Sequence, residues 1–136
     1  MKSRINFFLI IAMILMLIQI LLGISLREFI DNQIDILGLE KKDIWLEKPK
    51  LNFYVHRTFS LLVFLSNAYL FLLAKKSKIE MKFIKMINFL ILIEIIIGTC
   101  MYYFSFPILT QPIHLLISIL ILSLQFYWLL KLRKPY

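Results

Sequence analysis

The stretch Asn52-Phe-Tyr-Val-His56-Arg57-Thr-Phe-Ser-Leu-Leu opens one long apolar segment, and Gln111-Pro-Ile-His114-Leu-Leu opens another. His56 and His114 are the only two histidines in the chain. Each lies about one helical turn inside the start of its segment. If both segments cross a membrane in the same direction, the two imidazoles lie at the same depth near the same membrane face.

The composition is that of an integral membrane protein. Of the 136 residues, 61% are hydrophobic, whereas soluble domains average about 45–50%. The net charge of +8 could suggest nucleic-acid binding, but the charged residues form short clusters between apolar runs, so we expect no nucleic-acid partner. The single cysteine, Cys100, excludes an intramolecular disulfide and any Cys-x-x-Cys motif within this sequence.

Four apolar segments are long enough to cross the roughly 30 Å hydrocarbon core of a bilayer. We expect spans at about residues 5–26, 51–74, 83–104 and 111–130. The first is longer than the apolar region of a signal peptide and lacks a small-residue cleavage site, so we interpret it as an uncleaved transmembrane helix. The predicted fold is an all-α four-transmembrane-helix bundle, with residues 1–136 forming a single membrane domain.

The segment 27–50 is the one long polar segment and carries six of the eight acidic residues. Three apolar residues recur at helical spacing among these acids: Ile30, Ile34 and Leu37. This spacing predicts a short amphipathic helix lying at the membrane interface. We expect Gly38 to end that helix, Trp45 to act as an interfacial anchor, and Pro49 to mark the return into the membrane.

The distribution of lysine and arginine predicts the orientation of the chain in the plasma (inner) membrane. The N-terminus, the segment 75–85 and the C-terminus together hold ten of the sixteen basic residues. Short loops rich in lysine and arginine stay on the cytoplasmic side. We therefore expect a multi-pass protein with both termini in the cytoplasm, and with the loop 27–50 and both histidines near the outer face.

The two halves of the chain resemble each other. The segment 18–23 aligns with 93–98 at an offset of 75, and a second group of residues aligns at an offset of 58. The informative matches are Gln19 with Glu94, Gly23 with Gly98, His56 with His114, Asn67 with Gln125, and Tyr69 with Tyr127. Chance explains matches between Ile/Leu-rich positions, but it explains these polar and glycine positions less well. We predict a repeat of two helical hairpins related by a pseudo-two-fold axis along the membrane normal.

Two histidines at equivalent positions suggest a ligand site. Histidine inside a bilayer is costly and usually faces the bundle interior. A single such histidine is more often a packed residue than a ligand, but His56 and His114 across a pseudo-dyad could supply the two axial ligands of one haem iron. Zinc fits less well, because it needs three or four protein ligands and no cysteine or acid lies at this depth.

Neighbouring residues fit the same hypothesis. Arg27 and Arg57 lie on the histidine side, where they could pair with haem propionates or act as interface anchors. Gly23 and Gly98 lie near the histidine depth, where a missing side chain admits a flat ligand or a close helix.

Two polar pairs lie deeper in the predicted bundle. We expect Gln19 and Glu94 to hydrogen-bond to each other as an inter-helix bond, with a proton-handling role for Glu94 as the alternative. Asn67 and Gln125 are expected to bond across the bundle.

The motifs of all four spans resemble those of the C-terminal half of haem A synthase. The motifs are Gln19-Ile-Leu-Leu-Gly23 with Arg27-Glu28, then His56-Arg57, Glu94-x-x-x-Gly98 and Gln111-Pro-x-His114-Leu. Members of that family usually have two four-helix bundles and oxidise the C8 methyl of haem O to the formyl of haem A, for cytochrome oxidase assembly. The resemblance implies that this chain matches the half that holds a haem b cofactor.

The resemblance also implies site residues and partners. His56 and His114 match the axial pair, and the cofactor-binding residues would also include Arg27, Arg57 and Gln111. Haem O and haem A are possible as substrate and product. Expected partners are the lipid bilayer, haem, and either a second copy of the chain or a separate N-terminal half.

The chain departs from the family pattern in its catalytic features. The family's substrate half carries a catalytic Glu three residues before its first histidine, where this chain has Phe53, and a cysteine pair in an outer loop, which this chain lacks. We therefore expect a component of an oxidoreductase whose catalytic residues are not identified here. The alternatives are a non-catalytic membrane cytochrome b or haem carrier, and a structural membrane protein without haem.

Overall fold

The computed structural model describes residues 2–48 and 51–133, so the return expected at Pro49 lies outside the described residues. It contains four long α-helices and one short 3-10 helix, η1, and no strand occurs in the described part of the chain. The elements are α1 (Lys2–Leu37), η1 (Leu39–Ile44), α2 (Leu51–Lys76), α3 (Lys82–Tyr103) and α4 (Thr110–Arg133). The predicted all-α fold class is confirmed.

Each of the four α-helices is long and apolar enough to cross a membrane. In hydrocarbon no water can satisfy backbone N–H and C=O groups, and an α-helix satisfies them within its own segment. The chain is therefore a multi-pass membrane protein.

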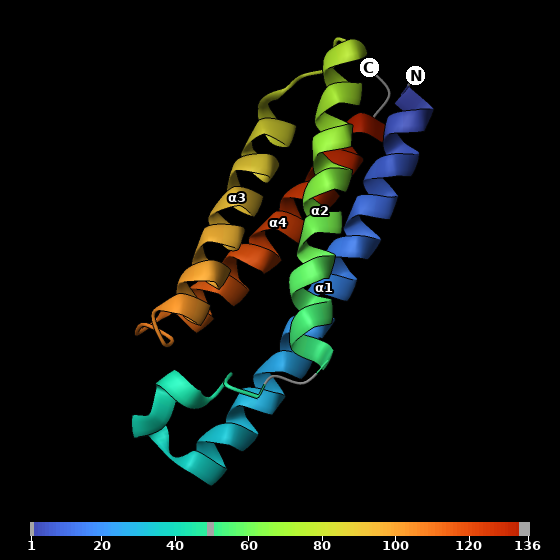
Figure 1. Ribbon diagram of the computed structural model, residues 1–136. Coiled ribbons are helices and arrows are strands. Elements are labelled where there is room, and N and C mark those ends of the chain that lie inside the picture. Colours follow the sequence, from blue (N-terminus) through green and yellow to red (C-terminus); the bar gives the residue numbers. More distant parts are fainter. Residues whose placement is uncertain (1, 49–50, 134–136) are drawn as a thin grey trace.

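The helices form a ring in which each packs against two others. In the described part of the chain, α1 contacts α2 and α4, and α3 contacts the same two helices. Both termini lie at the end of the bundle that also holds the α2–α3 connection, whereas η1 and the α3–α4 connection lie at the opposite end (Figure 1). Exchanging the α1–α2 hairpin for the α3–α4 hairpin preserves this arrangement, in agreement with the predicted repeat.

The tightly packed core occupies the half of the bundle nearest the termini. Its most buried side chains come from the first half of α1 and α3 and from the second half of α2 and α4, and they include Leu9, Leu70, Ile87, Ile121 and Trp128. All five are 3% exposed or less. Large apolar side chains fill most of the space between the helices in this half.

A polar pair crosses the bundle inside this packed half. Gln125 Nε2 donates to Asn67 Oδ1 over 3.0 Å, as the sequence predicted, and both residues are fully buried. Asn88 Nδ2 donates to the backbone carbonyl of Asn67 over 3.3 Å. The two hairpins are therefore joined by side-chain hydrogen bonds that cannot be replaced by lipid.

The prediction of a separate amphipathic helix at the interface is wrong. Instead α1 continues without a break from the first span to Leu37. No glycine or proline interrupts it after residue 23, and Arg27 forms an i,i+4 salt bridge with Asp31 at 2.6 Å. Gly38 ends the helix as predicted, with a φ of 89° that favours glycine.

Trp45 does not face lipid as an interfacial anchor would. It is 3% exposed, its Nε1 donates to the Gly38 carbonyl over 3.3 Å, and its ring centroid lies 5.5 Å from that of Phe106. Trp45 also packs with Phe29 and Ile30. Through these contacts, the segment after α1 packs against the α3–α4 connection.

We predict that the Asn67–Gln125 bond stabilises the bundle. Asn67→Leu leaves Gln125 without its partner and should lower the unfolding free energy by about 1–2 kcal/mol, measured by titration with a denaturing detergent and circular dichroism. The double variant Asn67→Leu/Gln125→Met should recover part of that loss, because no polar group is then left unpaired. Ser123→Ala is the control, since Ser123 is exposed and bonds only its own helix backbone. Equal losses in the single and double variants would contradict the prediction.

Candidate functional site

A cavity of about 710 Å³ lies in the half of the bundle away from the termini, and all four α-helices line it. Small-molecule sites in proteins are typically about 300–1,000 Å³. Its walls are mostly apolar, with a few polar side chains that include both histidines. The cavity is therefore large enough for a cofactor-sized ligand.

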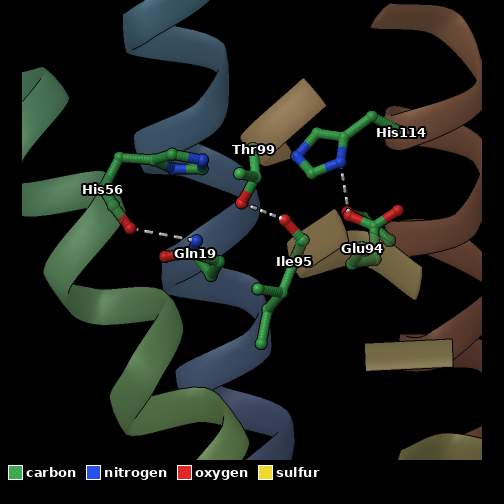
Figure 2. A network of polar contacts seen from close by, with 7 residues as sticks. Gln19, His56, Glu94, Ile95, Thr99 and His114 are labelled. Carbon is green, nitrogen blue, oxygen red and sulfur yellow. Dashed lines mark hydrogen bonds and ion pairs between the residues drawn. The ribbon is translucent and has the colours of Figure 1, made fainter. Parts of the chain in front are cut away.

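The two histidines face each other across this cavity. His56 projects from α2 and His114 from α4, and their rings point toward one another (Figure 2). The ring centroids are 6.5 Å apart and the ring planes are inclined by 71°. The structure thus brings together the two residues that the repeat had matched.

A glycine lies against each imidazole. A Cβ atom added at Gly23 of α1 would lie 3.3 Å from Cε1 of His56, and one added at Gly98 of α3 would lie 3.6 Å from Cε1 of His114. At Gly23 the absence of a side chain lets the His56 ring lie this close to α1, whereas at Gly98 a Cβ would meet His114 at an ordinary contact distance. The two contacts are equivalent, as the repeat predicted.

The polar residues one turn deeper do not bond to each other, so the expected Gln19–Glu94 hydrogen bond is wrong. Gln19 Nε2 donates to the backbone carbonyl of His56 over 3.2 Å. Glu94 Oε2 lies 2.9 Å from Nδ1 of His114, and both contacts are drawn in Figure 2. Each polar residue contacts the histidine of its own hairpin, because the cavity separates the two hairpins at this level.

Ser118 is a site residue that the sequence analysis missed. Its Oγ donates to Oε2 of Glu94 over 2.8 Å. A signal was available, because Ser118 and Ser60 are related by the same offset of 58 that relates the two histidines, and both line the cavity. Ser60 instead donates to the carbonyl of Arg57.

Several buried polar atoms at the cavity have no hydrogen-bond partner among the described residues. They include Nδ1 of His56, Oε1 of Gln19 and Oε1 of Glu94. Nδ1 of His114 is at ion-pair distance from Glu94, without the alignment of a hydrogen bond. Most buried polar groups in proteins are paired. This concentration therefore indicates a place built to contact something other than the chain's own side chains.

The remaining predicted site residues lie around the same cavity. Arg27, Arg57 and Gln111 all line it. Arg27 is already held by Asp31, which accepts from both Nη2 and Nε. No carboxylate pairs with Arg57 within residues 2–48 and 51–133, so its charge is available to a ligand.

Protein side chains alone do not form a metal site here. Within the described ranges, no group of three or more His, Cys, Asp or Glu residues could hold a metal ion. A closed zinc site, which needs three or four protein ligands, does not fit this arrangement. Two facing imidazoles suit an iron whose other ligands come from a porphyrin.

Phe53 occupies the cavity wall one turn before His56. It is 8% exposed, and its ring stacks on Tyr102 with centroids 5.3 Å apart. This part of the wall is therefore aromatic.

Comparison with known proteins gives one match. A family model described as cytochrome oxidase assembly protein matches residues 1–126. The match includes both histidines, both glycines that contact them, and the polar residues Gln19 and Glu94. No curated protein and no solved structure matches the chain.

The two glycines provide a matched pair for testing the site geometry. Alanine should stabilise the helix at Gly98 by about 0.5–1 kcal/mol, because its Cβ meets His114 at an ordinary contact distance. At Gly23 the same gain should be offset, since the His56 ring must move by a few tenths of an ångström. With only two histidines in the chain, labelled-histidine NMR resolves each ring. Gly23→Ala should shift the His56 signal more than Gly98→Ala shifts that of His114, and equal shifts would contradict this geometry.

Proposed function

We propose that this chain, which belongs to the cytochrome oxidase assembly protein family (COX15-CtaA, the haem A synthase family), binds one haem between His56 and His114. The family gives the chain a role in cytochrome oxidase assembly. The observation that carries the proposal is the pair of opposed imidazoles, 6.5 Å apart, at a cavity lined by all four helices.

The dimensions of the site support haem. With metal–nitrogen bonds of roughly 2.0–2.1 Å, as in zinc–histidine sites, two axial imidazoles on one ion have centroids roughly 6 Å apart. The observed 6.5 Å is close to this value. A glycine of the neighbouring helix lies beside each ring, and the walls of the cavity are mostly apolar. The residues present therefore fit the group.

The chain's own residues have distinct roles in this proposal. His56 and His114 hold the iron from opposite sides. Arg57, whose charge is not paired with a carboxylate of the described residues, and Gln111 contact the propionate edge, and Arg27 does so while it remains bonded to Asp31. When bound, the haem supplies reversible one-electron transfer at a potential set by its axial ligands and their surroundings.

We assign the bound haem as haem b and the chain as the cofactor half of a haem A synthase-type oxidoreductase. In this role the chain takes part in the oxidation of haem O to haem A by exchanging electrons with a second bundle that holds the substrate. The second bundle is a further copy of this chain or a separate N-terminal half. The aromatic wall at Phe53 supports this division, because it supplies no carboxylate where the resembled substrate half has its catalytic Glu.

The same observation favours a second candidate, a membrane cytochrome b or haem carrier without catalysis of its own. Phe53 would then be the normal residue of a site that only binds haem. In either case we place the chain in the plasma membrane with both termini in the cytoplasm, because the basic residues cluster at the end of the bundle that holds the termini (Figure 1). The histidines then lie near the outer face.

The haem proposal predicts a low-spin b-type absorption spectrum. We expect detergent-purified protein, expressed with haem supplied, to show this reduced-minus-oxidised spectrum and to release haem b on extraction. His56→Ala and His114→Ala should each abolish the low-spin signal, because one axial ligand is lost. Leu116→Ala is the control, since Leu116 lies on the same helix as His114 but is 66% exposed on the bundle surface. A colourless wild-type protein with normal helix content would overturn the proposal.

A second measurement separates the two candidate functions. The haem-loaded protein is incubated with haem O, an electron source and oxygen, first alone and then with a haem A synthase N-terminal half. Haem A formed only with the added half supports the cofactor-half assignment. Haem A formed by the chain alone supports catalysis by a second copy. No haem A in either case, with a normal b-type spectrum, supports the carrier.

A further inference from the structure

Matched residues of the two hairpins occupy equivalent positions but differ in the chemistry of their side chains. Gln19 and Glu94 occupy equivalent positions one turn below the histidines. Gln19 is neutral, and its amide contacts the backbone of His56. Glu94 carries a carboxyl group, and Oε2 lies 2.9 Å from the imidazole of His114. The pseudo-symmetric site is therefore asymmetric in charge.

Glu94 has few partners apart from this imidazole. The residue is 8% exposed, and burial of an unpaired carboxylate is costly. Oε2 accepts from Ser118 over 2.8 Å and faces Nδ1 of His114, whereas Oε1 has no partner among the described residues. No lysine or arginine forms an ion pair with it in the described part of the chain. Its negative charge is thus directed at one histidine.

A carboxylate beside Nδ1 determines how an imidazole acts as a ligand. It favours the tautomer with hydrogen on Nδ1, which leaves the Nε2 lone pair free for a metal, and it increases the basicity of the ring. Nδ1 of His56 has no such partner.

We propose, on the basis of the haem site above, that Glu94 is a positioning residue that makes the two axial ligands unequal. Glu94 orients His114 and makes it the stronger electron donor, whereas His56 is the weaker ligand. More electron donation stabilises oxidised iron relative to reduced iron. Glu94 therefore lowers the reduction potential of the bound haem through its effect on His114.

The test is the midpoint potential of the haem-loaded protein in wild type, Glu94→Gln and Leu116→Ala. Glutamine keeps the shape of residue 94 but removes its charge. Loss of such an outer partner typically changes metal binding by 10–100-fold. We expect the one-electron reduction equilibrium to shift at least tenfold toward reduced iron in Glu94→Gln, which is a rise of about 59 mV. Leu116→Ala should leave the potential nearly unchanged, because Leu116 is exposed on the bundle surface and is not among the residues that line the cavity.

Two further variants distinguish a change in electron donation by His114 from a loosening of the haem site. Glu94→Asp keeps the charge but withdraws it from Nδ1, so its potential should lie between those of wild type and Glu94→Gln. Ser118→Ala removes a donor from Oε2, which concentrates negative charge toward His114, so its potential should fall. A loosened site would instead change the potential in the same direction in all of these variants.

The outcomes distinguish this inference from the haem proposal. Absence of haem from the wild-type protein would refute the proposed function. A haem-loaded wild type whose potential is unchanged in Glu94→Gln, or shifted equally in Leu116→Ala, would refute only the role of Glu94. If Glu94→Gln cannot be loaded with haem, the other two variants decide. A higher midpoint potential in Glu94→Asp together with a lower one in Ser118→Ala supports the inference, and any other pattern refutes it.

Discussion

Hydrocarbon offers no hydrogen bonds to a polar group, and this constraint governs most of the structure. It makes all four membrane segments helical, since only a helix satisfies its backbone internally. It also turns the polar side chains inward. Asn67 and Gln125 bond to each other in the packed half of the bundle, and Gln19, Glu94 and the two histidines gather at the cavity. These buried polar groups therefore either join helices or line the cavity.

The division of the bundle into a packed half and a hollow half positions the site. Near the termini, large side chains such as Leu70, Ile87 and Trp128 fill the space between helices. At the other end, Gly23 and Gly98 stand where helices approach the imidazoles. At the same end, Trp45 packs against Phe106 of the α3–α4 connection. The packed half holds the four helices together, and the two rings face each other across the hollow half.

The internal repeat explains why the site can be nearly symmetric in position and asymmetric in chemistry. Equivalent backbone positions give equivalent glycine–imidazole contacts, because these depend on helix packing alone. A single change of residue type, glutamine in one hairpin and glutamate in the other, gives only one histidine a carboxylate neighbour. In a repeat of this kind, the residue beside each of two ligands of one cofactor can differ, so the properties of each ligand can be set separately.

The sequence by itself determined the four helices, the repeat, the pairing of His56 with His114 and the bond between Asn67 and Gln125, because hydrophobic length and the matched polar positions carry that information locally. It did not determine the continuous α1, the burial of Trp45 or the partners of Gln19 and Glu94. These features depend on distances between helices, and the periodicity of apolar residues in the sequence does not give those distances. Only the tertiary structure showed that the cavity separates Gln19 from Glu94, so that each contacts the histidine of its own hairpin.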